Sequence, residues 1–349
     1  CDTWDMAYVL YPGLKSYSLS KLSQFLDSPH ARPHRAVEDA MATMEVFLSM
    51  AEKFFEFDIQ TVSEMQGFSN RSTWVLSYLL RRLESDKIIQ RTSTYSENQS
   101  HRDTNRFGIP GLDIESISKR INPPKSLRTN RQILPLDVDL VGSLLKKTSS
   151  LAQTIRGFEE RPQQLDMARA IADSLNRKQH LIVEAGTGVG KSMAYLLPAL
   201  LYSSINKKRV VVSTKTINLQ EQLFNKDVPT LLESLNGIQG VSVKDTKFTQ
   251  LKGRANYVCL RRWAHMRSSE TLTDNEARFL SKTLVWLQKT NTGDRSELNL
   301  GHRGAAAPWD RLSSAQGSQE CLNNSDPCFL RAAREKAARE QAAREKAAR

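Results

Sequence analysis

One segment of this 349-residue chain constrains its fold more than any other: LIVEAGTGVGKS, residues 181–192, in which three apolar residues precede a glycine-rich turn. Gly186, Gly188 and Gly190 allow backbone conformations that residues with a β-carbon avoid, so the turn can approach an anion closely. The helix expected next presents its positive end to the same anion. A simple turn needs neither the strand before nor the helix after. This order therefore predicts a phosphate-binding loop.

The residues that close the loop suit a nucleoside triphosphate with its magnesium ion. Lys191 can reach the β- and γ-phosphates, and the Ser192 hydroxyl can ligate Mg²⁺. The loop begins with alanine, where the strict pattern has glycine. We predict an ATP and Mg²⁺ site formed by eight consecutive residues: Ala185, Gly186, Thr187, Gly188, Val189, Gly190, Lys191 and Ser192.

Around the loop, helical segments alternate with short apolar segments. The spacing of apolar residues predicts helices over 164–175 and 191–202, and buried strands over 180–183 and 209–213. A further strand is expected to end near Leu251. Such alternation is typical of an α/β fold, a parallel sheet covered by helices.

The charge of the chain favours a polyanionic partner. Its net charge is +12 and its isoelectric point is near 9.6, which would attract nucleic acid. Part of this excess can lie on solvated helices, so charge supports a DNA partner without locating its site. Because no long apolar run and no N-terminal signal pattern occur, we expect a cytoplasmic protein with no membrane partner. The sequence indicates no particular oligomeric state.

A motif upstream of the loop extends the prediction from triphosphate to base. Arg161-Pro-Gln-Gln164, placed before a helix, resembles the glutamine motif that reads adenine. With the loop, it resembles the DinG group of superfamily-two DNA helicases, relatives of the XPD repair helicases. The resemblance implies a RecA-like parallel sheet with helices on both faces, and assigns Arg161 and Gln164 to ATP binding.

Downstream, VVVSTKTINLQEQL, residues 210–223, resembles the family segment that contacts the DNA backbone. The resemblance assigns this role to Ser213, Thr214 and Thr216, on DNA that is single-stranded or forked. Hydroxyl groups suit phosphate oxygens. Helix capping by Thr216 or Asn218 is the structural alternative, and the two roles are compatible.

LKGRANYVCL, beginning at Leu251, resembles the approach to the family's iron–sulfur insertion, with Cys259 as the first ligand. The family's cluster takes four cysteines, one early and three close together. Here only Cys321 and Cys328 form the late group. The resemblance thus implies a degenerate or incomplete cluster site, and three ordinary thiols are the alternative.

The first fifty residues resemble the C-terminal part of a proofreading-type 3′–5′ exonuclease, like the epsilon subunit of DNA polymerase III. In HRAVEDAMAT, His34 matches the general base and Asp39 a ligand of one of two metal ions. The resemblance implies a mostly helical remnant of an RNase H-like domain. No Asp-x-Glu motif accompanies it, so we expect no exonuclease activity. Fusions of this order occur in bacteria, which favours the bacterial cytoplasm.

We expect four parts along the chain. The motor part lacks a D-E-A-H type motif and a second motor domain, so we expect ATP and DNA binding with little or no turnover. The parts are an exonuclease-like region at 1–52, a helical region and polar linker at 53–150, a first motor domain at 151–331 with a partial iron–sulfur insertion from about 253, and a charged repetitive helix at 332–349.

Two other functions remain open. In a non-catalytic DNA-binding module, residues 61–90 would form a winged helix, with Asn70, Arg71 and Ser72 opening the recognition helix. A packed helical bundle with Trp74 in its core explains the same residues. A different P-loop ATPase or kinase is the other alternative. The glutamine motif speaks against it, because such an enzyme does not need this motif.

Overall fold

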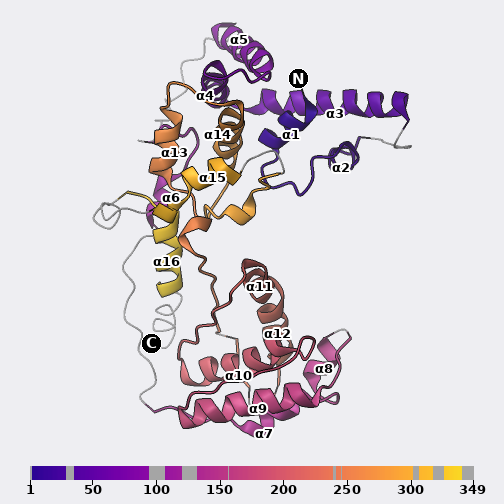
Figure 1. Ribbon diagram of the computed structural model, residues 1–349, viewed down its shortest axis with the longest axis vertical. Helices are drawn as coiled ribbons and strands as arrows, with labels where there is room; N and C mark the ends of the chain where they lie inside the picture. The colour runs from indigo at the N-terminus through magenta and orange to yellow at the C-terminus, as the bar shows by residue number, and fades with distance from the viewer. Residues whose placement is uncertain are drawn as a thin grey trace. The chain divides into compact units, whose positions relative to one another are not determined.

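Helices are the main regular elements of the part that the structure describes, and they are joined by extended segments and turns (Figure 1). By chain contacts it divides into two compact units, residues 1–122 with 253–334 and residues 123–252 with 335–349. Residues 253–334, expected as an insertion in the motor domain, thus group with the N-terminal region. No described helix is long and apolar enough to cross a membrane. The computed structural model describes residues 2–28, 35–93, 107–119, 132–155, 157–238, 241–244, 246–301, 306–316 and 326–339.

The first unit is built around one buried helix, α14 (Asp274–Leu287). Thr273 caps this helix and forms a reciprocal capping box with Glu276. Nearly every side chain from Ala277 onward is buried, which marks a central helix. The remaining helices of this unit are α1 (Thr3–Leu10), α2 (Leu19–Phe25), α3 (Ala36–Glu56), α4 (Ile59–Asn70), α5 (Ser77–Ser93), α6 (Ile114–Lys119), α13 (Leu260–Arg267), α15 (Ala306–Leu312) and the start of α16 (Phe329–Arg339).

The second unit packs α9 (Pro162–Arg177) against α10 (Lys191–Asn206) and α7 (Val138–Leu144). Ala168 and Ala172 of α9 and Leu197 of α10 belong to its core. These two long helices confirm those predicted on either side of the loop. The shorter helices are α8 (Ser150–Thr154), α11 (Ile217–Gln222), a π-helical turn at Leu223–Asp227, and α12 (Val228–Leu235).

None of the three predicted strands is formed in the described residues, and the segment before Leu251 also lies outside helices and strands. Residues 180–183 and 209–213 lie outside helices and join no strand, and only two isolated bridges occur, both elsewhere. Ile182 is 97% exposed and Val211 is 77% exposed, although burial was predicted for both segments. A strand needs backbone partners on a neighbour, and the described residues give these segments none. The sheet of the expected fold is therefore not observed.

Two matched truncations test this exposure. Leu197→Ala removes a fully buried side chain and should lower the free energy of unfolding by about 2–5 kcal/mol. Ile182→Ala should change it by less than about 0.5 kcal/mol, because the side chain is exposed. Denaturant unfolding of the whole chain measures both. Equal losses would show that Ile182 is covered, as the predicted sheet requires.

A buried lysine lies at the centre of the first unit. Lys282 of α14 has its Nζ 3.7 Å from the ring centre of Tyr8, and it donates to the Tyr17 hydroxyl at 3.1 Å and to the carbonyl of Asn299. Burial lowers the pKa of Lys282 to about 7. The folded state therefore resists protonation of this amine, while the unfolded state accepts it up to its ordinary pKa of 10.5.

The stability cost of Lys282 is thus fully present below pH 7 and shrinks as pH rises toward 10.5. We expect Lys282→Met to raise the free energy of unfolding relative to the parent, and this gap to be larger at pH 7 than at pH 9. Urea unfolding at the two pH values gives the gap directly. A gap that does not change with pH would show that Lys282 keeps its ordinary pKa when folded.

Candidate nucleotide and nucleic-acid site

The predicted phosphate loop lies directly before α10, in the second unit. Gly188 and Gly190 have φ values of 81° and 80°, a left-handed conformation that favours glycine. A β-carbon on Gly190 would also collide with Nε2 of Gln164, which would have to move. At Gly188 and Gly190 the loop therefore has the conformation that its glycine pattern predicted, whereas Gly186 does not have a positive φ.

Lys191 folds back over the loop from the first position of α10. Its Nζ donates to the carbonyl of Ala185 at 2.9 Å and to that of Gly186 at 2.6 Å. The side chain is otherwise exposed, so an arriving phosphate can take the place of these carbonyls. Ser192 follows it, half-buried at the same helix end, and a single hydroxyl fits Mg²⁺, which binds few protein ligands beside phosphate and water.

Two residues of the predicted glutamine motif reach the loop. Arg161 caps α9, whose next residue is proline, a common start for a helix. Its Nη1 donates to the carbonyl of Gly188 at 2.7 Å, and Nε2 of Gln164 donates to the carbonyl of Gly190 at 2.9 Å. The structure thus brings together Arg161, Gln164 and the loop. The motif had suggested a contact with the base, and sequence reasoning missed these contacts with loop carbonyls.

The predicted DNA-contact residues run from the last residue of the exposed segment 209–213 to the residue before α11. Thr216 caps α11 and accepts from the amide of Leu219 at 3.3 Å, which confirms the capping role. Oγ1 of Thr214 donates to the carbonyl of Thr216 at 3.1 Å. Ser213 is exposed, and contact of these hydroxyls with DNA stays a prediction.

The exonuclease-like and cysteine residues are only partly described. Asp39 is half-buried in the first turn of α3, whereas His34 lies outside the described residues. Cys259 caps α13 and Cys328 precedes α16, both half-buried and neither in a disulfide, and Cys321 again falls outside. Within the described ranges, no three His, Cys, Asp or Glu side chains are placed to hold a metal ion. The cluster therefore stays a prediction.

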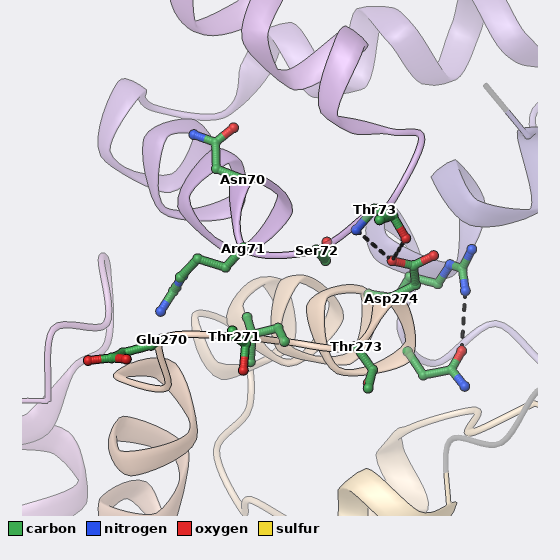
Figure 2. Close-up of a pocket in the computed structure, with 11 residues that line it drawn as sticks. Asn70, Arg71, Ser72, Thr73, Glu270, Thr271, Thr273 and Asp274 are labelled. Carbon is green, nitrogen blue, oxygen red and sulfur yellow. Dashed lines mark hydrogen bonds between the residues drawn. The ribbon is translucent and has the colours of Figure 1, made fainter.

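A hollow of about 840 Å³ lies in the first unit, between residues 70–73 and 270–275. Figure 2 shows Thr73 joined across it to Asp274, whose Oδ1 accepts from both the amide and the hydroxyl at 2.9 Å. Arg71 donates to the carbonyls of Arg267 and Ser269 at 2.6 and 2.8 Å. Hydrogen bonds between residues that line the hollow therefore join the turn after α4 to α13 and α14.

These contacts correct the winged-helix alternative. Asn70 ends α4, and Arg71 and Ser72 lie in the following turn, so they do not open a helix, because α5 begins at Ser77. The Arg71 guanidinium is occupied by backbone carbonyls. Trp74 is buried and its indole donates to Asp5 at 3.1 Å. This region is a packed helical bundle.

Comparison with known proteins gives matches in the region of the phosphate loop and at the N-terminal end of the sequence. Residues 162–261 match the DEAD/DEAH box helicase family, and residues 1–47 match the exonuclease family. The chain is 31% identical over 314 residues to the 3′-5′ exonuclease DinG of Bacillus subtilis, covering 89% of this chain and 31% of that protein. It is 37% identical over 201 residues to the ATP-dependent DNA helicase YoaA of Haemophilus influenzae, covering 56% and 29% respectively.

A third relative, the 3′-5′ exonuclease DinG of Staphylococcus haemolyticus, is 29% identical over 300 residues, which is 86% of this chain and 30% of that protein. The chain thus spans roughly a third of the length of these relatives. Its helicase match includes α9, the phosphate loop and α10. The chain is therefore similar to DEAD/DEAH box helicases over residues 162–261, to exonucleases over residues 1–47, and to the DinG and YoaA proteins.

Proposed function

We propose that this chain belongs to an ATP-dependent DNA helicase of DinG type with an exonuclease-related N-terminal region. One observation carries the proposal: Arg161, Gln164 and Lys191 all donate hydrogen bonds to carbonyls of a single glycine-rich loop. Relatives named as helicase and exonuclease support the same reading. The bacterial relatives favour the bacterial cytoplasm as its location.

ATP and Mg²⁺ are the ligands proposed for the loop. Amides of residues 185–190 and the positive end of α10 would bind the triphosphate, with Lys191 on its outer phosphates. Ser192 would ligate Mg²⁺. Adenine recognition by Gln164 follows from the resemblance to the glutamine motif. Bound Mg²⁺ would neutralise phosphate charge, while the chain's own residues bind and orient the nucleotide.

DNA, single-stranded or forked, is the proposed partner. The net charge of +12 favours a polyanion, and the hydroxyls of Ser213, Thr214 and Thr216 follow an exposed segment of the second unit. A RecA-like parallel sheet is proposed for residues 180–183 and 209–213, and the Ile182 truncation above tests it.

Three finer points are proposals as well. Asp39, with His34, would be the remnant of an exonuclease site. Cys259, with Cys321 and Cys328, would ligate an iron–sulfur cluster. The domain boundaries at residues 52, 150 and 331 belong to the same proposal.

Lys191→Ala tests the nucleotide site. Hydrogen bonds to a charged group contribute about 1.5–3 kcal/mol, so the affinity for ATP·Mg²⁺ should fall roughly 10- to 100-fold. Lys146→Ala removes an exposed lysine of the same unit that is not part of the loop, and serves as the control. Calorimetric titration of the whole chain measures binding without requiring hydrolysis. Equal ATP affinities for the two variants would reject the site.

Thr214→Val tests the DNA contact. Loss of a neutral hydrogen bond of about 0.5–1.5 kcal/mol should weaken single-stranded DNA binding roughly two- to tenfold. Thr154→Val is a matched control, because the Thr154 hydroxyl also donates to a backbone carbonyl, that of Ser150 at 3.0 Å. Fluorescence anisotropy with a labelled oligonucleotide at fixed salt compares the two. If both variants bind like the parent, Thr214 does not contact DNA.

A further inference from the structure

The first turn of α9 is attached to the phosphate loop by two side chains of that one turn. Arg161 is the residue before the helix and Gln164 is its third residue, and the amide of Gln164 donates to the carbonyl of Arg161 at 2.9 Å. Their side chains reach Gly188 and Gly190 respectively. A single helical turn therefore holds the loop at two points.

Both points are carbonyls of the loop's left-handed residues, Gly188 and Gly190. In a planar trans peptide the carbonyl and the following N–H point in opposite directions. A bond that holds the carbonyl of Gly188 therefore directs the N–H of Val189 away from Arg161. The carbonyl of Gly190 also accepts from the amide of Ala194 at 3.2 Å, so Gln164 and the first turn of α10 together direct the N–H of Lys191. Oriented N–H groups of this kind form an anion-binding nest.

The two holding side chains are themselves restrained. Gln164 is 5% exposed, and its Nε2 lies so close to Gly190 that a β-carbon on this glycine would collide with it. Arg161 forms an ion pair with Glu159 through Nη2 at 2.7 Å, while Nη1 bonds the loop. Each donor is therefore already oriented when the loop meets its ligand, which lowers the entropic cost of ordering the loop on binding.

We propose that Arg161 and Gln164 are positioning residues that hold the phosphate loop in its anion-binding conformation, whatever base the ligand carries. The inference rests on the proposed triphosphate site, but it assigns Gln164 a task that is independent of adenine. The ligand class that depends on these residues is the triphosphate group itself. ATP, GTP and bare tripolyphosphate then lose affinity together when either side chain is removed.

Titration of the whole chain with ATP, GTP and tripolyphosphate, each with Mg²⁺, tests this. Arg161→Ala should weaken all three ligands by the same factor, roughly three- to thirtyfold. Gln164→Ala should weaken GTP and tripolyphosphate by a similar factor, and ATP at least as much, because its proposed adenine contact is lost as well. Gln164→Glu keeps the shape but replaces the donor with an acceptor facing the carbonyl of Gly190. It should weaken all three ligands at least as much as Gln164→Ala.

Two other residues of α9 provide matched controls. Gln163→Ala removes an exposed glutamine of the same turn, and Arg177→Ala removes an arginine paired with Asp173 at 3.0 Å. Neither should change the three affinities. The unfolding midpoint of each variant shows whether the fold is kept, and Arg161→Ala, at a partly exposed site, carries the test if Gln164→Ala unfolds.

The outcomes separate the two proposals. A loss confined to ATP would show that Gln164 reads the base and would overturn the positioning role. Unchanged affinity for all three ligands in folded variants would overturn it too. A parent chain that binds none of the three ligands would overturn the proposed function, and this inference with it.

Discussion

The orientation of two peptide groups, at Gly188 and Gly190, is the constraint on which the proposed nucleotide site depends. Backbone N–H groups can face an anion only if the carbonyls before them point away. The side chains of Arg161 and Gln164, at the start of α9, hold these carbonyls by donating hydrogen bonds to them. The packing of α9 on α10 through Ala168, Ala172 and Leu197 keeps donor and loop at a fixed separation. Core packing in the second unit is thus linked to the chemistry of the loop.

Local patterns in the sequence predicted the helices on either side of the loop and its left-handed glycines, while nucleotide binding stays a prediction. The glycines, Lys191 and the two flanking helices depend on residues close together in the chain, and the structure has them as predicted. The structure forms no strand at 180–183 or 209–213, and the sheet there stays a proposal, because strand pairing depends on partners distant in sequence that a local pattern does not identify. An apolar run shows the preference for burial, but it does not supply the neighbour that would bury it.

The first unit was harder to predict for the same reason. Arg71 bonds carbonyls almost two hundred residues away, and Lys282 lies against Tyr8 and Tyr17 from the opposite end of the chain. Nothing in the local sequence of α14 distinguishes a buried lysine from an exposed one. Its burial follows only from packing between residues 1–122 and 253–334, which the structure groups into one unit.

A crystal structure of this chain grown with ATP and Mg²⁺ tests the central claim most directly. We expect the triphosphate in the loop at residues 185–190, with Nζ of Lys191 moved from the carbonyls of Ala185 and Gly186 onto phosphate oxygen. Arg161 and Gln164 should still bond Gly188 and Gly190. ATP bound elsewhere, or a loop left empty at saturating ATP with Lys191 unmoved, would contradict the assignment of this loop as the nucleotide site.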